Sequence, residues 1–386
     1  MLECFSVVNL PPSGNSLHVR MLDFDTFRGR VIHSMRIITS ICLVVFLAGS
    51  AAAQETKARK PNPLFADESI LEVRIEAPFS RIMLERSTED ELPGQLAYTD
   101  VESGEVTLDI GIRTRGRYRQ QARICPFAPL RLNFRKEQTK KTLFTRTNKV
   151  KLVTHCRDHS KRYSQGVLKE YLAYRILNML TDASFRVRLL RATYVDTASD
   201  KPDRVNYAFM IEHDDRMAKR LDMKVSDERQ TTIDSLDGSH TNLGSVFQYL
   251  IGNTDFSPIL GAAGEPCCHN YVLLRPEDDR ATSRLSVPYD FDMSGLVNAK
   301  HASPNPRFKL RNVRQRLYRG RCANNEHLEN TLQTFRDRRS DIEKLIGDST
   351  HMNNGTKKSL RKYIDDFYAS INNPKAVKSR MIKKCI

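Results

Sequence analysis

The spacing of apolar residues changes along this chain, and that change limits the folds it can adopt. Within 107–113 and again within 130–134, apolar and polar residues alternate, as in strands with one buried face. From Leu243 to Ile251 apolar residues follow helical spacing, and two more helical segments lie on either side of the turn at 353–355. The sequence therefore predicts a β-rich first part, a mixed centre and a helical end.

The mixed centre contains further predicted strands and one predicted helix. The strands are expected at 149–153, 186–195, 205–212, 271–274 and 285–291. The helix is expected over 164–180, and because it is apolar on most sides it should be largely buried. Glu170 is the exception on this helix, and it needs a cationic partner because burying an unpaired charge is costly.

The amino terminus has the pattern of a secretory signal. Met35 and Arg36 precede an apolar run at 37–47 and the small residues of 48–53, which predicts cleavage before Gln54. The run is shorter than the roughly 20 apolar residues that span a bilayer, although a retained membrane anchor is the alternative. We therefore expect 1–34 to be a misannotated upstream extension, 35–53 a signal peptide and 54–63 a disordered linker. The exported protein, periplasmic or extracellular, would comprise lobes at 64–212 and 213–386.

Charge and cysteine content restrict the partners and the compartment. The net charge of +16 favours anionic partners, such as nucleotide phosphates or an acidic protein, but the chain has no aromatic-basic nucleic-acid motif, so no nucleic acid is expected. Six cysteines follow the signal, and an even number in an exported chain indicates disulfides. The favoured pairs are Cys125 with Cys156, and Cys267 or Cys268 with Cys322. A zinc site at 267–269 would lack a second paired-cysteine element.

Two polar segments in the second half carry the candidate chemistry. Asp255 follows the helical segment in Gly-Asn-Thr-Asp, and Asp290 and Asp292 end the predicted strand in Pro-Tyr-Asp-Phe-Asp, with Asn270 between them. Phosphoryl transfer needs a carboxylate to orient the attacking hydroxyl, and hard oxygen ligands for Mg²⁺ or Mn²⁺. Asp255 suits the first task, and Asn270 and Asp290 suit the second. Asp292 should share a strand face with Asp290, because strand side chains alternate.

The order of these motifs resembles the CotH kinase-like family and, more distantly, the HipA-type kinases. The resemblance covers roughly 71–317, and only the set from Asp255 to Asp292 is specific. It implies an α+β, atypical protein-kinase-like fold with a β-rich N-terminal lobe and a mainly helical C-terminal lobe. It also implies that Asp255 is the catalytic base, that Asn270 and Asp290 bind metal, and that Asp292 is a second-metal ligand.

The same kinase logic assigns nucleotide-binding residues in the first half. Lys149 or Lys151 would hold the phosphates of ATP, oriented by Glu170, and Arg115 with Gly116 would form a phosphate-contacting turn. The expected activity is metal-dependent transfer of phosphate from ATP to Ser or Thr hydroxyls of a protein. Two alternatives remain: a catalytically inactive binding or assembly protein of the envelope, and a nucleotidyltransferase.

Overall fold

The computed structural model describes residues 62–262, 264–278 and 283–386. The predicted upstream extension, the signal peptide and nearly all of the predicted linker lie outside these residues. Across the described segments, no helix combines the length and the apolar character needed to cross a bilayer.

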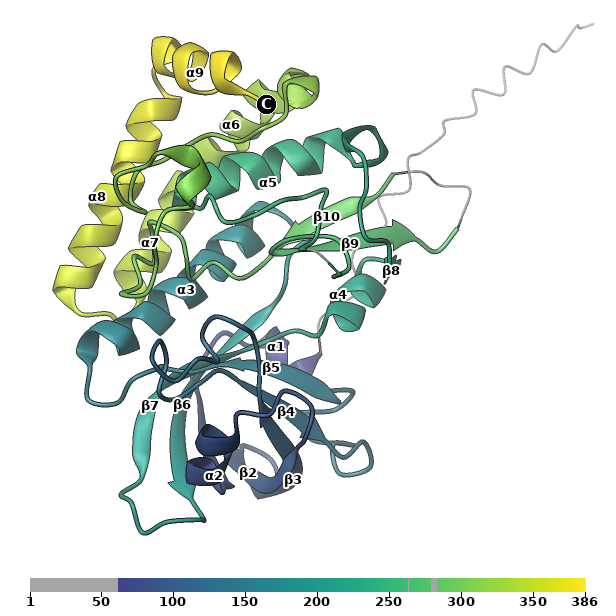
Figure 1. Cartoon of the computed structure of the whole chain (residues 1–386), viewed down its shortest axis with the longest axis vertical. Coiled ribbons are helices and arrows are strands. Elements are labelled where there is room, and N and C mark those ends of the chain that lie inside the picture. The colour runs from purple at the N-terminus through teal and green to yellow at the C-terminus, as the bar shows by residue number, and fades with distance from the viewer. Residues whose placement is uncertain (1–61, 263, 279–282) are drawn as a thin grey trace, which may run out of the picture. The chain divides into compact units, whose positions relative to one another are not determined.

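Seven strands of the first half close into a barrel (Figure 1). Neighbouring strands follow the order β1-β2-β3-β4-β5-β7-β6, and all pairs are antiparallel except β1 with β6, whose parallel pairing closes the barrel. Short helices α1 and α2 accompany the first strands. The bounds are α1 Pro63–Ala66, β1 Leu71–Ala77, α2 Phe79–Glu85, β2 Leu92–Asp100, β3 Gly104–Thr114, β4 Leu130–Phe134, β5 Lys149–Val153, β6 Val187–Asp196 and β7 Arg204–Ile211.

The predicted fold class is therefore wrong. An α+β kinase-like fold would have two lobes with a β-sheet in the first, whereas these strands form a closed barrel of mixed strand direction. Alternation along a strand marks its buried face but does not specify its partners, so the closure by β1 and β6 has no signal in the sequence.

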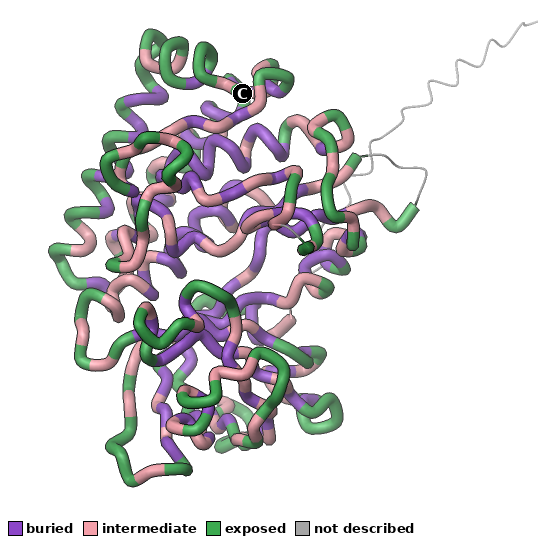
Figure 2. The backbone as a smooth tube through the Cα atoms, in the orientation of Figure 1, coloured by how far each residue is buried: buried purple, intermediate pink, exposed green. Residues whose placement is uncertain are grey.

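Strands β6 and β7 are buried on both faces because they belong to two cores. In β7, Ala208 and Met210 point into the barrel interior, while Phe209 and Ile211 pack in the second core with helix α3 (Lys161–Leu180). The remaining strands show the usual alternation, and Figure 2 shows the resulting buried stretches inside the barrel and along the helices. Helix α3 is thereby fixed against the outside of the barrel.

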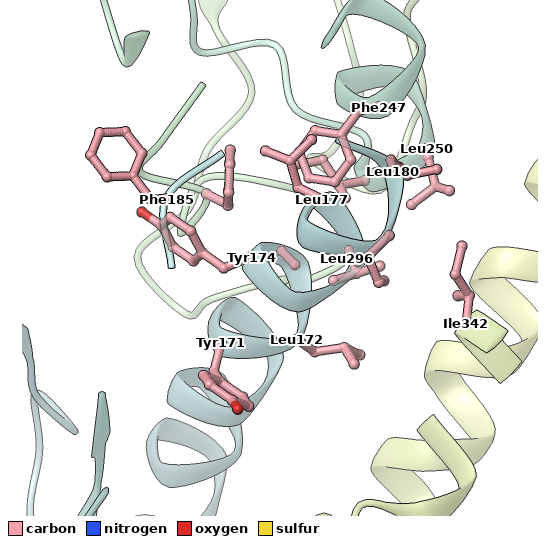
Figure 3. Close-up of a cluster of buried hydrophobic side chains, with 14 of the residues drawn as sticks. Tyr171, Leu172, Tyr174, Leu177, Leu180, Phe185, Phe247, Leu250, Leu296 and Ile342 are labelled. Atoms are coloured by element: carbon pink, nitrogen blue, oxygen red, sulfur yellow. The ribbon is translucent and has the colours of Figure 1, made fainter. Parts of the chain in front are cut away.

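The second half is built from helices around α3. Helix α3 lies between the barrel and the carboxyl-terminal helices (Figure 1), and Leu177 of α3, Phe247 of α5 and Leu296 belong to one hydrophobic core (Figure 3). The α3 helix is apolar on most sides, as its sequence predicts, and is buried over most of its length. The helices are α4 Asp214–Arg220, α5 Gly238–Ile251, α6 Leu328–Asp337, α7 Arg339–Asp348, α8 Asn354–Ile371 and α9 Pro374–Arg380.

A small antiparallel sheet, ordered β10-β9-β8, lies beside these helices. Its strands are β8 Met223–Val225, β9 Tyr271–Pro276 and β10 Leu285–Pro288. Strand β10 is shorter than predicted, because Asp290 has a φ of 59°, in the left-handed region that a strand cannot contain. Asp290 and Asp292 are consequently loop residues, and the prediction that they share a strand face is wrong.

Three cysteine pairs lie within disulfide distance. Cys125 pairs with Cys156, as favoured from the sequence. The other favoured pairing is wrong, because Cys322 pairs with Cys385 and Cys267 pairs with its neighbour Cys268. The pair at 322 and 385 holds the last residues of the chain, where the Ile386 amide also donates to the Gly320 carbonyl at 3.0 Å.

Candidate functional site

The candidate catalytic residue Asp255 is placed by the end of helix α5. Gly252 ends this helix in the left-handed conformation, with a φ of 65°, and turns the chain into Asn253-Thr254-Asp255. The Asn253 side chain then accepts a hydrogen bond from the Asp255 amide at 2.9 Å. Asn253 is fully buried, so this turn is fixed against the core while the Asp255 side chain stays 32% exposed.

Two polar side chains from the loop before β9 orient the Asp255 carboxylate. His269 Nε2 lies 2.9 Å from one oxygen, and the Asn270 amide nitrogen donates to the other at 3.2 Å. The hydrogen bond that His269 donates to Asp255 is the largest influence on His269 and raises the pKa of its imidazole. A carboxylate has about four lone-pair sites, so both oxygens keep capacity to accept from a hydroxyl.

Asn270 and Asp290 are adjacent in space and share an uncommon backbone conformation. Both have positive φ, 55° and 59°, and the Tyr289 amide donates to the Asn270 carbonyl at 3.0 Å. The Asp290 amide donates to the buried Tyr174 hydroxyl at 2.9 Å, which links this loop to α3. Asn and Asp tolerate left-handed backbone better than most residues, and such positions are concentrated at functional sites.

Arg119 connects the remaining acidic side chains. It lies in the loop after β3, and its guanidinium contacts Glu170 of α3 at 3.2 Å, Asp290 at 3.2 Å and Asp292 at 2.9 Å. Only 10% of the Arg119 side chain is exposed. His301 also donates to Asp292 at 3.0 Å. Arg119 is thus the cationic partner that the sequence required for Glu170, and it comes from a segment about 50 residues away.

These contacts shift the pKa values of the carboxyl groups in different directions. Burial is the largest influence on Glu170 and raises its pKa to about 7, against the opposing charge of Arg119. Burial also acts to raise the pKa of Asp292, but Arg119 and His301 outweigh it and lower that pKa to about 2. Burial and the neighbouring Asp292 charge raise the pKa of Asp290, although its side chain is 36% exposed, which limits the rise. One buried guanidinium therefore contacts three carboxyl groups whose pKa values differ.

The candidate phosphate-binding residues of the first half do not all join this group. Lys151 pairs with Asp214 at 2.8 Å and lies over the Tyr289 ring, and Lys149 is exposed beside α4, so neither contacts Glu170. Burial is the largest influence on Arg115 and lowers its pKa. The charges of Arg119 and Asp290 also act on it, so Arg115 lies near the site. Gly116 has a φ of 84°, as a tight turn requires, with open space around it.

A loop from the barrel, residues 115–124, covers the carboxylates. Besides Arg119, this loop places Arg117 in an ion pair with Glu265, and the Tyr118 hydroxyl donates to the His301 carbonyl at 3.4 Å. The cavity between this loop, Glu170 and Asp292 has a volume of about 30 Å³. That volume suits a water molecule and not a nucleotide, so a larger ligand would require the loop to move.

The chemistry of the oxygen donors fits a hard divalent cation. Asn270 Oδ1, Asp290 Oδ2 and Asp292 Oδ1 have no hydrogen bond to a described residue, and Mg²⁺ is commonly held by one or two carboxylates with water and phosphate oxygens. No group of three or more His, Cys, Asp or Glu that could hold a metal is found within 62–262, 264–278 and 283–386. A cation would therefore bind through few protein ligands, beside Arg119.

Three residues that the structure brings into the site have no role predicted from the sequence. Arg119 lies three positions beyond the Arg115–Gly116 turn. The one sequence signal for it is the buried charge of Glu170, which predicts a cationic partner without identifying it. His269 is next to Asn270 in sequence, so its contact with Asp255 follows once those two residues are placed together. His301 lies in irregular structure, and no pattern in the sequence indicates it.

No family model, curated protein or solved structure is significantly similar to this chain. The likeness to CotH kinase-like proteins thus depends on the motifs alone.

Proposed function

We propose that this protein is a metal-dependent phosphotransferase that transfers phosphate from ATP to Ser or Thr hydroxyls of an exported protein. The main support is the convergence of Asp255, Asn270 and Asp290, which come from three separate segments and are joined by hydrogen bonds through Asn270 and Tyr289. A carboxylate held next to hard oxygen donors is what phosphoryl transfer requires. The order of these motifs, which resembles that of CotH kinase-like proteins, points to the same reaction.

In the proposed reaction Asp255 orients the acceptor hydroxyl and takes its proton. The hydroxyl oxygen forms a bond to the γ-phosphorus, and the bond from that phosphorus to the β,γ-bridging oxygen breaks, so that ADP leaves. His269 and Asn270 fix the position of the carboxylate, and general-base catalysis of this kind contributes about 10² to 10⁴ in rate.

Metal and nucleotide would be held by different parts of the site. Asn270, Asp290 and Asp292 would bind Mg²⁺ or Mn²⁺, which supplies positive charge against the phosphates. Arg119 and Arg115 are the cations near these acids, and they would contact the phosphates in place of the expected lysines. Admission of ATP requires the 115–124 loop to leave the carboxylates, since the covered cavity is only about 30 Å³.

The second candidate is a binding protein without catalysis, and one observation favours it. The Arg119 guanidinium already forms ion pairs with Glu170, Asp290 and Asp292, and the loop that carries it is held at Glu265 and His301. In that interpretation the ion pairs join the barrel to the helical half, and the loop does not open.

Label transfer separates these functions. The purified chain is incubated with Mn²⁺ or Mg²⁺ and with ATP labelled at the γ- or α-phosphate, alone and with casein as a surrogate acceptor. We expect γ-label on protein, reduced at least 100-fold in Asp255→Asn and Asp290→Asn, and unchanged in the exposed control Asp234→Asn.

The other outcomes each identify a different function. Transfer of α-label would indicate nucleotidyl transfer. Equal transfer by wild type and both site variants would refute the site. No transfer, with no rise in thermal stability on adding ATP and metal, would favour the binding protein.

A further inference from the structure

A second charged cavity lies on the barrel, apart from the Arg119 cluster. It has a volume of about 290 Å³ and is formed where the ends of β4 and β5 meet α4. The residues that line it include His213 and one acidic residue, Asp215. Four cationic side chains also line it: Arg131, Lys149, Arg216 and Lys219. Arg119, Asp255, Asp290 and Asp292 do not line it, so it is a separate feature from the candidate active site.

The four cations of this cavity are not neutralised by the described part of the protein. None of them forms an ion pair with a described carboxylate. Asp214, whose charge acts on Arg131, is already paired with Lys151 at 2.8 Å, and Asp215 is 66% exposed and lies next to His213. Like charges gathered without counter-charge create a positive potential that attracts anions.

The electrostatic state of the cavity wall agrees with this view. Burial is the largest influence on both Arg131 and His213 and lowers the pKa of each, neighbouring positive charges add to this effect, and the Asp214 carboxylate opposes it at both residues. Arg131 Nη2 lies 3.2 Å from His213 Nε2, and His213 Nδ1 accepts a hydrogen bond from the Asp215 amide. The wall thus presents an arginine that forms no direct ion pair with a described carboxylate, although the charges of Asp214 and Glu91 act on it.

Two buried polar atoms of the wall have unused hydrogen-bonding capacity. Arg131 Nε and Thr147 Oγ1 have no hydrogen-bond partner among the described residues, and Thr147 as a whole is only 5% exposed. Leaving such a group unpaired costs about 1 to 3 kcal/mol, so folded proteins usually provide it with a partner. Both residues line the cavity, and a ligand oxygen bound there would be that partner.

We propose that this cavity binds a tetrahedral oxyanion of the phosphate class, either free phosphate or the phosphate group of an ester. Arg131 and Thr147 would hold the anion at the wall, and Lys149, Arg216 and Lys219 would neutralise it from the rim. Charge-assisted hydrogen bonds to arginine and lysine are the usual means of holding such groups. The volume leaves room for the part of a molecule that carries the phosphate.

Binding is tested with the full chain by isothermal titration calorimetry. The probes are inorganic phosphate, glycerol 3-phosphate and a deca-glutamate peptide, all at one ionic strength set with NaCl. The test variant is the double substitution Lys149→Ala/Lys219→Ala, and its matched control is Lys358→Ala/Lys362→Ala on α8; all four lysines are exposed, so folding should be preserved. Arg216→Ala is the second test variant.

We expect phosphate or glycerol 3-phosphate to bind the wild type, with Kd at least tenfold higher in both test variants and within twofold of wild type in the control. Tighter binding of glycerol 3-phosphate than of phosphate identifies an ester as the ligand, and the reverse identifies the free anion. Absence of phosphate binding, an equal loss in the control, or tighter binding of the acidic peptide would overturn the proposal. Asp255 is not involved, so the result is independent of the label-transfer experiment.

Discussion

Replacing Glu170 by glutamine should remove a pH dependence of stability that this buried carboxyl imposes. Its side chain is 3% exposed, and burial raises its pKa from the ordinary 4.5 to about 7, against the Arg119 charge. When an acid has a higher pKa in the folded state, its stabilising contribution is complete below the unfolded pKa and is lost as the pH rises through the folded pKa. The window runs from about 4.5 to about 7, and at about 1.4 kcal/mol per pKa unit the loss reaches roughly 3 kcal/mol by pH 8.

Other groups titrate in the same range, so the difference between two proteins must be measured. The pKa of His269 is raised by its hydrogen bond to Asp255, so His269 also loses stabilisation as the pH rises. Burial lowers the pKa values of His213 and His240, whose contributions are lost as the pH falls. Asp292, with a pKa of about 2, changes only in stronger acid. Subtracting the Glu170→Gln curve from the wild-type curve cancels these shared contributions.

The assay is urea unfolding at pH 4.5 and pH 8 at constant ionic strength, with the disulfides intact. Between these pH values the wild type should lose roughly 3 kcal/mol more unfolding free energy than Glu170→Gln. Glu68→Gln is the matched control. Like Glu170, Glu68 forms an ion pair with an arginine, in its case Arg175 of α3, but its side chain is 72% exposed. Its pH profile should follow that of the wild type. A difference below about 1 kcal/mol for Glu170→Gln, or an equal one for Glu68→Gln, would refute the reasoning.

Two further predictions concern the cation of the site and the end of the chain. Arg119→Met should lower the unfolding free energy by about 3 to 5 kcal/mol at pH 8, because the buried carboxylates lose their cationic partner. The loss should be smaller at pH 5, where Glu170 takes up a proton. Urea unfolding at both pH values measures these changes, and a change under about 1 kcal/mol at pH 8 would contradict the prediction. Cys322→Ser/Cys385→Ser should lower the unfolding free energy by about 4 kcal/mol, since the disulfide closes a loop of 63 residues in the unfolded chain. If the urea midpoint under oxidising conditions is unchanged, this pair does not constrain the unfolded chain.

Many of the local elements could be predicted from the sequence, whereas strands β1 and β2 and the assembly of the elements could not. Alternation at 130–134 and 149–153 and the apolar helix ending at Leu180 predict elements that the structure contains, because these patterns depend only on which residues are buried. The parallel contact of β1 with β6 joins segments more than 100 residues apart, and β1 is not among the strands that the sequence predicts. A prediction of strands therefore left the barrel unrecognised.

The candidate site shows the same division. The order of the motifs groups Asp255, Asn270 and Asp290, and in the structure these residues are linked by hydrogen bonds through Asn270 and Tyr289. Of the three, Asp255 alone follows an element whose end was predicted, because Asn270 precedes β9 and β10 ends earlier than its sequence pattern indicates. The cation did not follow from such a pattern. Arg119 lies in an irregular loop, where no periodicity assigns a side chain to a buried or an exposed face. The lysines predicted to hold the phosphates do not take its place, because Lys151 pairs with Asp214 and Lys149 is exposed.

Under the proposed function, catalysis and stability compete for the charge of Arg119. In the closed arrangement its guanidinium forms ion pairs with Glu170 and Asp292 and joins the barrel loop to α3, which stabilises the fold. A nucleotide needs that loop to move and offers phosphates for the arginine to contact. Glu170 would then be a buried carboxyl without its partner, and its pKa, already about 7, would rise further, so that it would take up a proton. Because protonated Glu170 needs no counter-charge, the cost of opening falls as the pH falls, and the loop is released most easily where this acid is neutral.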